Sequence, residues 1–458
     1  MTPDDVSTAL QLVLPSVRAD LEALVRIPSV SADPARLDDV HRCAEAVAHL
    51  LRNAGLPDVQ ILSVDGGLPA VVGRRPAADG APTVCLYAHH DVQPTGARSD
   101  WDTEPFEATE VDGRLYGRGA ADDKAGIGVH LAAVRALGDD VRVGLTLLIE
   151  GEEEIGSPTL DAFIDRYRDL LAADVFVLAD STNRAIGEPA LTTSLRGLVN
   201  CFVEVGTIEH GVHSGMYGGA VPDALTALCR LLATLHDDAG SVAIAGLHDA
   251  SGSAVEMTED ELRTQAQVLP GVDLIGTGSM ADRLWNKPAL TVLAIDSPRV
   301  DDASNTLQPR ARAKVSLRIP PGQDAAAAMA ALVDHLEAHA PWGAQVTVTP
   351  GSIGSAYRIE ASGPVYDAAR RAFATAWGTP SVDMGCGGTI PFVASFAEAF
   401  PSAAILVTGV EDPASRAHGA NESLHVAEWQ RACLAEALLL NELGSSATAA
   451  TEHDPRLN

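Results

Sequence analysis

The sequence is poor in basic residues and contains no long uninterrupted apolar run. Its 32 Lys and Arg residues stand against 62 Asp and Glu residues, which gives a formal net charge of −30. A protein that binds nucleic-acid phosphates or an anionic membrane surface needs a cationic face, so this charge argues against both partners. No segment approaches the ~20 consecutive apolar residues of a membrane-spanning helix.

Cysteine is also scarce and scattered. The six cysteines form no Cys-x-x-Cys pair, which argues against a structural zinc site of the finger type. The first ten residues, MTPDDVSTAL, are acidic and lack the basic region and apolar run of a secretory signal. We therefore expect free thiols and a cytoplasmic location.

What is present is enough apolar material for a large core. Hydrophobic residues make up 46% of 458 residues, a length that suggests two or three domains. Short, nearly continuous apolar runs occur at 83–89 and 143–150, at 174–180, and again at 402–409. Such runs are typical of parallel strands buried on both faces. The sequence predicts an α/β domain, residues 1–194 and 352–458, with a mostly parallel sheet covered by helices on both faces.

The segment between these two parts, residues 195–351, has a different pattern. Strand-like runs at 197–206, 289–296 and 311–320 alternate with helical patterns at 221–235 and 324–339. A last strand pattern follows at 344–350, whereas 236–285 is polar and irregular. This order predicts an inserted α+β domain of the split βαβ kind.

Side chains that could bind a metal follow each buried run of the α/β domain. Ligands bind outside the carboxyl ends of parallel strands, so these side chains are expected to converge. Imidazoles mixed with carboxylates suit zinc, cobalt or manganese. The candidates are His89 and Asp91 after the first run, Glu152–Glu154 after the second, Asp180 after the third, His418 after the last, and Asp122 and Asp123 before a helix.

Each candidate also has an ordinary structural explanation. Acids such as Asp122 and Asp123 stabilise a helix N-terminus, an acid run is commonly a solvated loop, and His418 could be a surface histidine. The glycine-rich segment 117–126 does not match a phosphate-binding loop, and Ser181 has no histidine at the spacing of a serine hydrolase. Only convergence at one sheet edge favours a metal-assisted hydrolase.

An ordered set of motifs resembles the M20 family of metallopeptidases, and most closely its dipeptidase branch, which includes carnosinases and cytosolic non-specific dipeptidases. The resemblance runs from about residue 15 to 440. Its motifs are HHDVQP (89–94), DGRLYGRGAADDKAG (112–126), EGEEEIGS (150–157), VHSGMYGG (212–219), ARAKVSLRIP (311–320), GGTIP (387–391) and AHGANES (417–423).

The resemblance implies a dipeptidase with two zinc ions per subunit, for which Mn²⁺ or Co²⁺ could substitute. One ion would take His89 and Asp180, the other Glu154 and His418, with Asp122 and a hydroxide shared between them. Asp91 would orient His89, and the peptide bond between Asp122 and Asp123 is cis in relatives. Glu153 would be the general base.

The inserted domain is implied to be a lid that forms a homodimer. His213 would reach the partner subunit's site and stabilise the oxyanion, and Asn305 would be contributed in the same way. Arg318 would bind the carboxylate of a small peptide substrate, because its planar fork matches both oxygens. The substrate pocket would be lined by Gly387, Gly388 and Thr389.

Two positions bear on the substrate. Asp180 is the residue that the resemblance associates with dipeptidases rather than with carboxypeptidases and deacylases. Gly385 and Cys386 stand where carnosinase-like relatives have Arg-Glu, and that glutamate is associated with the substrate's amino end. The alternative is therefore an N-acyl-amino-acid deacylase or carbamoylase on the same scaffold. A binding protein without catalysis is disfavoured, because every expected ligand and the base are present.

Overall fold

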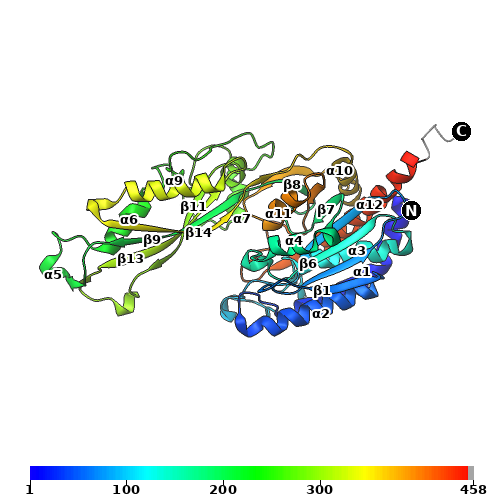
Figure 1. Cartoon of the computed structure of the whole chain (residues 1–458), viewed down its shortest axis with the longest axis horizontal. Helices are drawn as coiled ribbons and strands as arrows, with labels where there is room; N and C mark the ends of the chain where they lie inside the picture. The colour runs from blue at the N-terminus through cyan, green and yellow to red at the C-terminus, as the bar shows by residue number, and fades with distance from the viewer. Residues whose placement is uncertain (452–458) are drawn as a thin grey trace. The chain divides into compact units, whose positions relative to one another are not determined.

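The chain folds into two compact units, shown in the computed structural model of Figure 1, which describes residues 1–451. The first unit comprises residues 1–193, 360–384 and the chain from 391 onward, and the second comprises residues 194–359 and 385–390. None of the helices within residues 1–451 combines the length and the apolar composition that crossing a bilayer requires.

Four parallel strands form the centre of the large sheet. They lie in the order β6 (Gly144–Glu150), β3 (Thr83–His89), β7 (Val175–Leu178) and β17 (Ala404–Val407). Every residue of β6 and β7 is buried, so both faces of the sheet are covered. The expectation of parallel, doubly covered strands is confirmed.

Antiparallel strands extend this sheet on both sides, so the sheet is mixed. On one side lie β2 (Ala70–Arg75) and then β1 (Asp58–Leu62). On the other side lies β8 (Ala190–Leu195), which pairs with β15 (Tyr357–Arg358) and β16 (Val382–Cys386). The residues of β1 are at least partly exposed, so this strand has no apolar run to reveal it in the sequence.

Helices of the first unit cover the sheet. Three of them pack on one another: α1 (Pro3–Val25), α3 (Lys124–Leu137) and α12 (Val426–Thr451), with α10 (Pro364–Trp377) against α12. Trp429 of α12 lies so close to α3 that a Cβ at Gly128 would be 3.1 Å from its ring. Helix α2 (Leu37–Asn53) packs against β1 and β2, and α4 (Leu160–Leu171) packs against α11 (Pro391–Ala399). A separate small sheet is formed by β18 (Ser423–His425), β5 (Arg114–Tyr116) and β4 (Thr109–Val111).

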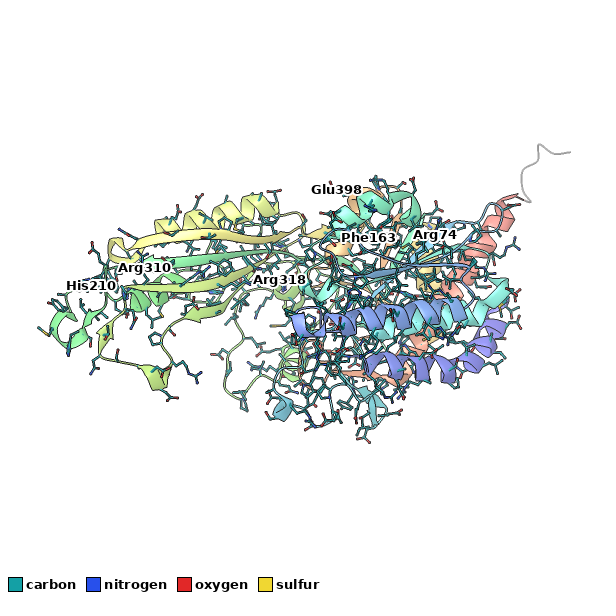
Figure 2. All side chains as sticks on the ribbon, turned by 60° about the horizontal axis from the view of Figure 1, so that its bottom comes forward. Arg74, Phe163, His210, Arg310, Arg318 and Glu398 are labelled. Atoms are coloured by element: carbon teal, nitrogen blue, oxygen red, sulfur yellow. The ribbon has the colours of Figure 1, made fainter. Side chains whose placement is uncertain are left out.

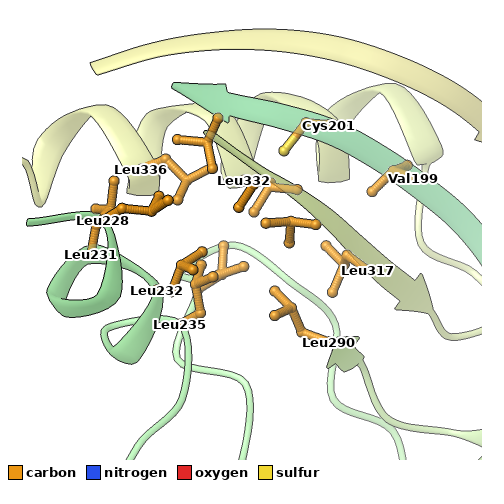
Figure 3. Packing of buried hydrophobic residues seen from close by; sticks show 14 of the residues in the cluster. Val199, Cys201, Leu228, Leu231, Leu232, Leu235, Leu290, Leu317, Leu332 and Leu336 are labelled. Atoms are coloured by element: carbon orange, nitrogen blue, oxygen red, sulfur yellow. The ribbon is translucent and has the colours of Figure 1, made fainter. Parts of the chain in front are cut away.

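The second unit contains a four-stranded sheet with helices on one face. The strand order is β11 (Ala289–Asp296), β13 (Arg310–Ile319), β9 (Gly197–Gly206) and β14 (Gln345–Gly354), and every pairing is antiparallel. Helices α6 (Ala224–Ala233) and α9 (Ala325–Ala338) pack against β9 and its neighbours, and their leucines form the core in Figure 3. This is the split βαβ order that the sequence predicted.

The remaining elements of the second unit are short. The segment expected to be irregular contains two helices, α7 (Glu259–Gln265) and α8 (Met280–Trp285), so that expectation is wrong for these residues. Helix α7 begins at a capping box of Thr258 and Glu261, a signal that spans only four residues. A two-stranded ladder joins β10 (Val212–His213) to β12 (Thr306–Leu307), and β10 leads into α5 (Ser214–Tyr217).

Candidate metal centre

The predicted metal ligands come together at the carboxyl ends of the parallel strands in the first unit. His89 is the last residue of β3, and its Nε2 lies 3.1 Å from Asp122 Oδ1 and 3.9 Å from Asp180 Oδ1. His418 Nε2 lies 3.0 Å from Asp122 Oδ2 and 3.2 Å from Glu154 Oε2. Segments up to 329 residues apart in sequence therefore meet at one cluster of imidazoles and carboxylates.

Asp122 lies at the centre of this cluster, with one histidine at each carboxylate oxygen. Burial opposes ionisation, but the hydrogen bonds from His418 and His89 outweigh it and lower the Asp122 pKa. Hydrogen bonds to Asp122 and Glu154 raise the pKa of His418 to about 11. The peptide bond to Asp123 is cis, and Asp123 Oδ1 accepts from Gly126 N (3.2 Å) at the start of α3. The helix-terminus explanation thus applies to Asp123, which also lies beside the cluster, while Asp122 lies at its centre.

Asp91 links the end of β3 to the acid run after β6. Its carbonyl oxygen lies 3.0 Å from His89 Nδ1, which leaves Nε2 of that ring facing the cluster. Its carboxylate oxygens accept from the backbone N–H groups of Glu153 (3.2 Å) and Glu154 (3.1 Å). Asp91 therefore orients the imidazole of one strand and the backbone of the next, which is more than the sequence predicted.

The two acids of the run have different surroundings. Glu154 Oε2 accepts from Gln93 Nε2 (2.8 Å) and its Oε1 from Gln93 N (3.1 Å), so its position is fixed by a residue that the sequence did not single out. Burial and the nearby Asp180 raise the pKa of Glu153 well above its usual value. Glu411, after β17, is a further acid close to Asp122, and burial raises its pKa too.

The donor atoms of this cluster suit divalent cations. Ligand atoms of His89, Asp123 and Asp180 lie within 4.8 Å of one another, and so do those of His89, Asp122 and Glu154. Buried carboxylates this close repel one another unless positive charge lies between them. Imidazole nitrogens and carboxylate oxygens are ligands of zinc, manganese and cobalt. The residues present therefore fit the metal ions that the resemblance implies.

A buried ion pair holds the Asp122 and His418 loops together. Arg118 and Glu422 are 1% and 0% exposed and lie 2.5 Å apart. Glu422 accepts from the backbone N–H groups of Gly119, Ala121 and Asp122. Arg118 Nη2 also donates to Gly419 O (3.0 Å), next to His418. Both residues lie in quoted motifs, but 304 residues separate them, so the sequence did not indicate their contact.

Replacing Arg118 with methionine is expected to lower the free energy of unfolding by about 3–5 kcal/mol, because the Glu422 charge stays buried without its partner. Urea unfolding followed by circular dichroism measures the change. The matched control is Arg98→Met, which removes a pair with Glu104 that is half exposed and should cost less than about 1 kcal/mol. Equal losses in the two variants would contradict this role of the pair.

His213 and Asn305, predicted to act in a partner's site, lie together on the second unit. His213 is exposed and pairs with Thr306 in the β10–β12 ladder, and Asn305 O accepts from Ser214 N (2.9 Å). Met216 and Tyr217, which follow His213, are 74% and 48% exposed. The structure thus places both polar residues at one exposed surface with two large apolar side chains.

The predicted substrate-binding residues form a second group in this unit. Arg318, near the end of β13, is half-buried, and Figure 2 shows it at the opposite end of that strand from Arg310. Its Nη1 donates to Thr389 Oγ1 (2.9 Å), and this hydroxyl donates to Arg196 O (2.6 Å). Gly387 O accepts from Arg196 Nε (3.2 Å), and Gly388 follows in the same loop. Arg196 is a basic residue that the sequence analysis missed, since it belongs to no motif that was assigned a role.

Comparison with known proteins gives consistent matches. The model of peptidase family M20/M25/M40 matches residues 85–442. A cysteinylglycine-S-conjugate dipeptidase of Corynebacterium striatum is 35% identical over 93% of this chain and 95% of its own. A human β-Ala-His dipeptidase is 30% identical over 88% of this chain and 82% of its own. The crystal structure of human carnosine dipeptidase 1 superposes with a TM-score of 0.84 at 26% identity, covering 97% and 99% of the two chains.

Proposed function

The chain belongs to peptidase family M20/M25/M40, and on that premise we propose that it hydrolyses dipeptides at a centre of two divalent cations. The observation that carries the proposal is the Asp122 carboxylate, which offers one oxygen toward each of two histidines. A carboxylate in that position can be shared by two cations, each with its own imidazole. The relatives described above, named as dipeptidases, support the substrate class.

We assign His89 and Asp180 to one cation and Glu154 and His418 to the other, with Asp122 common to both. Zinc is the ion we propose, with Mn²⁺ or Co²⁺ as possible substitutes. When bound, two such ions acidify a water molecule and polarise the carbonyl of the scissile bond. Asp91 and Gln93 hold His89 and Glu154 in place through the contacts described above.

Glu153 is proposed as the general base. Asp91 fixes its backbone, while no described ion pair occupies its carboxylate. Its burial near Asp180 raises its affinity for a proton, which suits a group that must accept one from the attacking water and return it to the leaving amine. We assign the stabilisation of the oxyanion to His213 of a second subunit, and the binding of the substrate carboxylate to Arg318.

A homodimer through the second unit is proposed as the active form. Strand β11 is an edge strand whose residues 291–296 are all exposed. Val292, Leu293 and Ile295 of this strand are 36%, 54% and 40% exposed. An exposed apolar edge strand readily pairs with another chain, and a second copy would bury it. The exposed His213 and Asn305 fit residues that act outside their own subunit.

The proposed function predicts metal-dependent hydrolysis of free dipeptides. Protein stripped by a chelator should hydrolyse none of a dipeptide panel, and Zn²⁺ or Mn²⁺ should restore turnover, because the ligand cluster cannot activate water without a cation. The turnover is measured as the release of amino acids from Cys-Gly, β-Ala-His and Ala-Ala, and N-acetyl and N-carbamoyl amino acids are tested in parallel. Cleavage of the acylated substrates alone would contradict the proposal and favour the deacylase alternative, to which Cys386 points.

The cytoplasmic location that the sequence predicts for this protein stays a prediction.

A further inference from the structure

Two arginines of the second unit lie against one loop, residues 387–389. Arg196, which directly follows β8, is 9% exposed, and Arg318 on β13 is half-buried. Thr389 joins them, because its hydroxyl accepts from Arg318 Nη1 and donates to Arg196 O. Arg196 Nε donates to Gly387 O, so both side chains are fixed against the loop 387–389.

Among the described residues no carboxylate compensates the positive charge of this pair, and the nearby Cys386 favours the charged form of both guanidinium groups. In the part of the chain that the structure describes, neither guanidinium forms an ion pair with a carboxylate. Nη1 of Arg196 is buried without a hydrogen-bond partner. Burial, followed by the nearby Arg318 charge, lowers the pKa of Arg196 to about 10. Buried charged donors are normally paired, so the unpartnered Nη1 of Arg196, close to the half-buried Arg318, calls for an anion.

The loop 385–389 approaches Arg196 and its surroundings closely. A Cβ at position 387 would lie 2.8 Å from Arg196 Nη2, so glycine at this position lets the loop pass close to the guanidinium. A Cβ at Gly385 would lie 2.6 Å from Trp285, so only glycine fits at this position without a shift of Trp285. Cys386, the next residue, has a small thiol side chain. The loop 385–389 therefore contains no carboxylate side chain that could pair with Arg196.

We propose that Arg196 is a second anion-binding group of the substrate pocket, which selects dipeptides whose C-terminal residue is Asp or Glu. This inference rests on the proposed function. Arg318 binds the α-carboxylate, and Arg196 binds the carboxylate of the side chain. A guanidinium suits this task because its planar N–H fork matches two carboxylate oxygens.

The test compares kcat/KM for Ala-Glu and Ala-Gln, which differ in charge but hardly in size, at low ionic strength with the metal-loaded enzyme. Ala-Glu should be favoured about tenfold, the usual order for a charged hydrogen bond. Arg196→Met should bring the ratio close to one. Cys386→Glu should also remove the preference, by pairing with Arg196, whereas the matched control Cys386→Gln should keep it.

Each other outcome overturns the inference. Equal kcat/KM values for the two substrates in the unaltered enzyme would show that no second anion site acts on the substrate. A ratio in Arg196→Met that stays near ten, while both kcat/KM values fall, would show that Arg196 only supports the loop. If no dipeptide is hydrolysed, the proposed function fails and the inference with it; hydrolysis without charge preference removes the inference alone.

Discussion

Replacing Glu153 with glutamine is expected to lower kcat for dipeptide hydrolysis by a factor of about 10³, within the usual range for loss of a general acid–base group. Glutamine keeps the size of the side chain but cannot accept the proton of the attacking water. The contacts that join Asp122 to His89 and to His418 do not involve Glu153, so both metal ions should stay bound. Steady-state kinetics and metal analysis of the same preparation measure the two quantities.

Glu152→Gln is the matched control, one residue earlier in the same acid run. Glu152 accepts from Leu68 N (3.0 Å) and from Thr159 N (2.8 Å), so it anchors the loop and lies outside the ligand cluster. This variant should lose about 1–3 kcal/mol of stability, because a partly buried donor loses its acceptor, while kcat changes only a few-fold. Turnover within tenfold of normal in Glu153→Gln would contradict the base assignment, and loss of one metal ion would identify Glu153 as a ligand instead.

The centre of the fold was predictable because its signal is local. Strands β3, β6 and β7 are buried on both faces, so each shows as an apolar run, and the polar residues that follow each run lie at one sheet edge. The same rule placed His89, Glu154 and Asp180 together. The exposed edge strand β1 and the short helix α7 bury too little apolar surface to produce such a signal.

The supporting contacts of the site were not predictable, since they depend on tertiary structure. Glu422 positions Asp122 through backbone N–H groups 300 residues away, and Gln93 reaches Glu154 across a strand end. Almost any residue can offer a backbone N–H or C=O group. A hydrogen bond to the backbone therefore leaves no characteristic pair of residues in the sequence. Arg196 was missed for a related reason, because its partner Gly387 O is a backbone atom.

Mixing inactive His213→Ala protein with inactive Glu153→Ala protein is expected to restore about a quarter of normal turnover. Each single variant should be slowed on the order of 10²-fold or more, since one lacks an oxyanion donor and the other the base. In a two-fold dimer with exchanged histidines, a mixed dimer has one site with both residues intact and one with neither. Random exchange makes half of the dimers mixed, which leaves one site in four active.

The dependence on mixing ratio distinguishes exchange between subunits from contamination by active protein. Activity should pass through a maximum at equal amounts, because the fraction of mixed dimers is largest there, and it should vanish at either end. The double variant Glu153→Ala/His213→Ala is the control, since mixing it with either single variant creates no complete site. No recovery under conditions where subunits exchange would place His213 in its own subunit's site or outside catalysis. The proposed contact through β11 needs its own test. If this edge joins the subunits, a charged residue in place of Leu293, which is 54% exposed in the single chain, should abolish the restored activity.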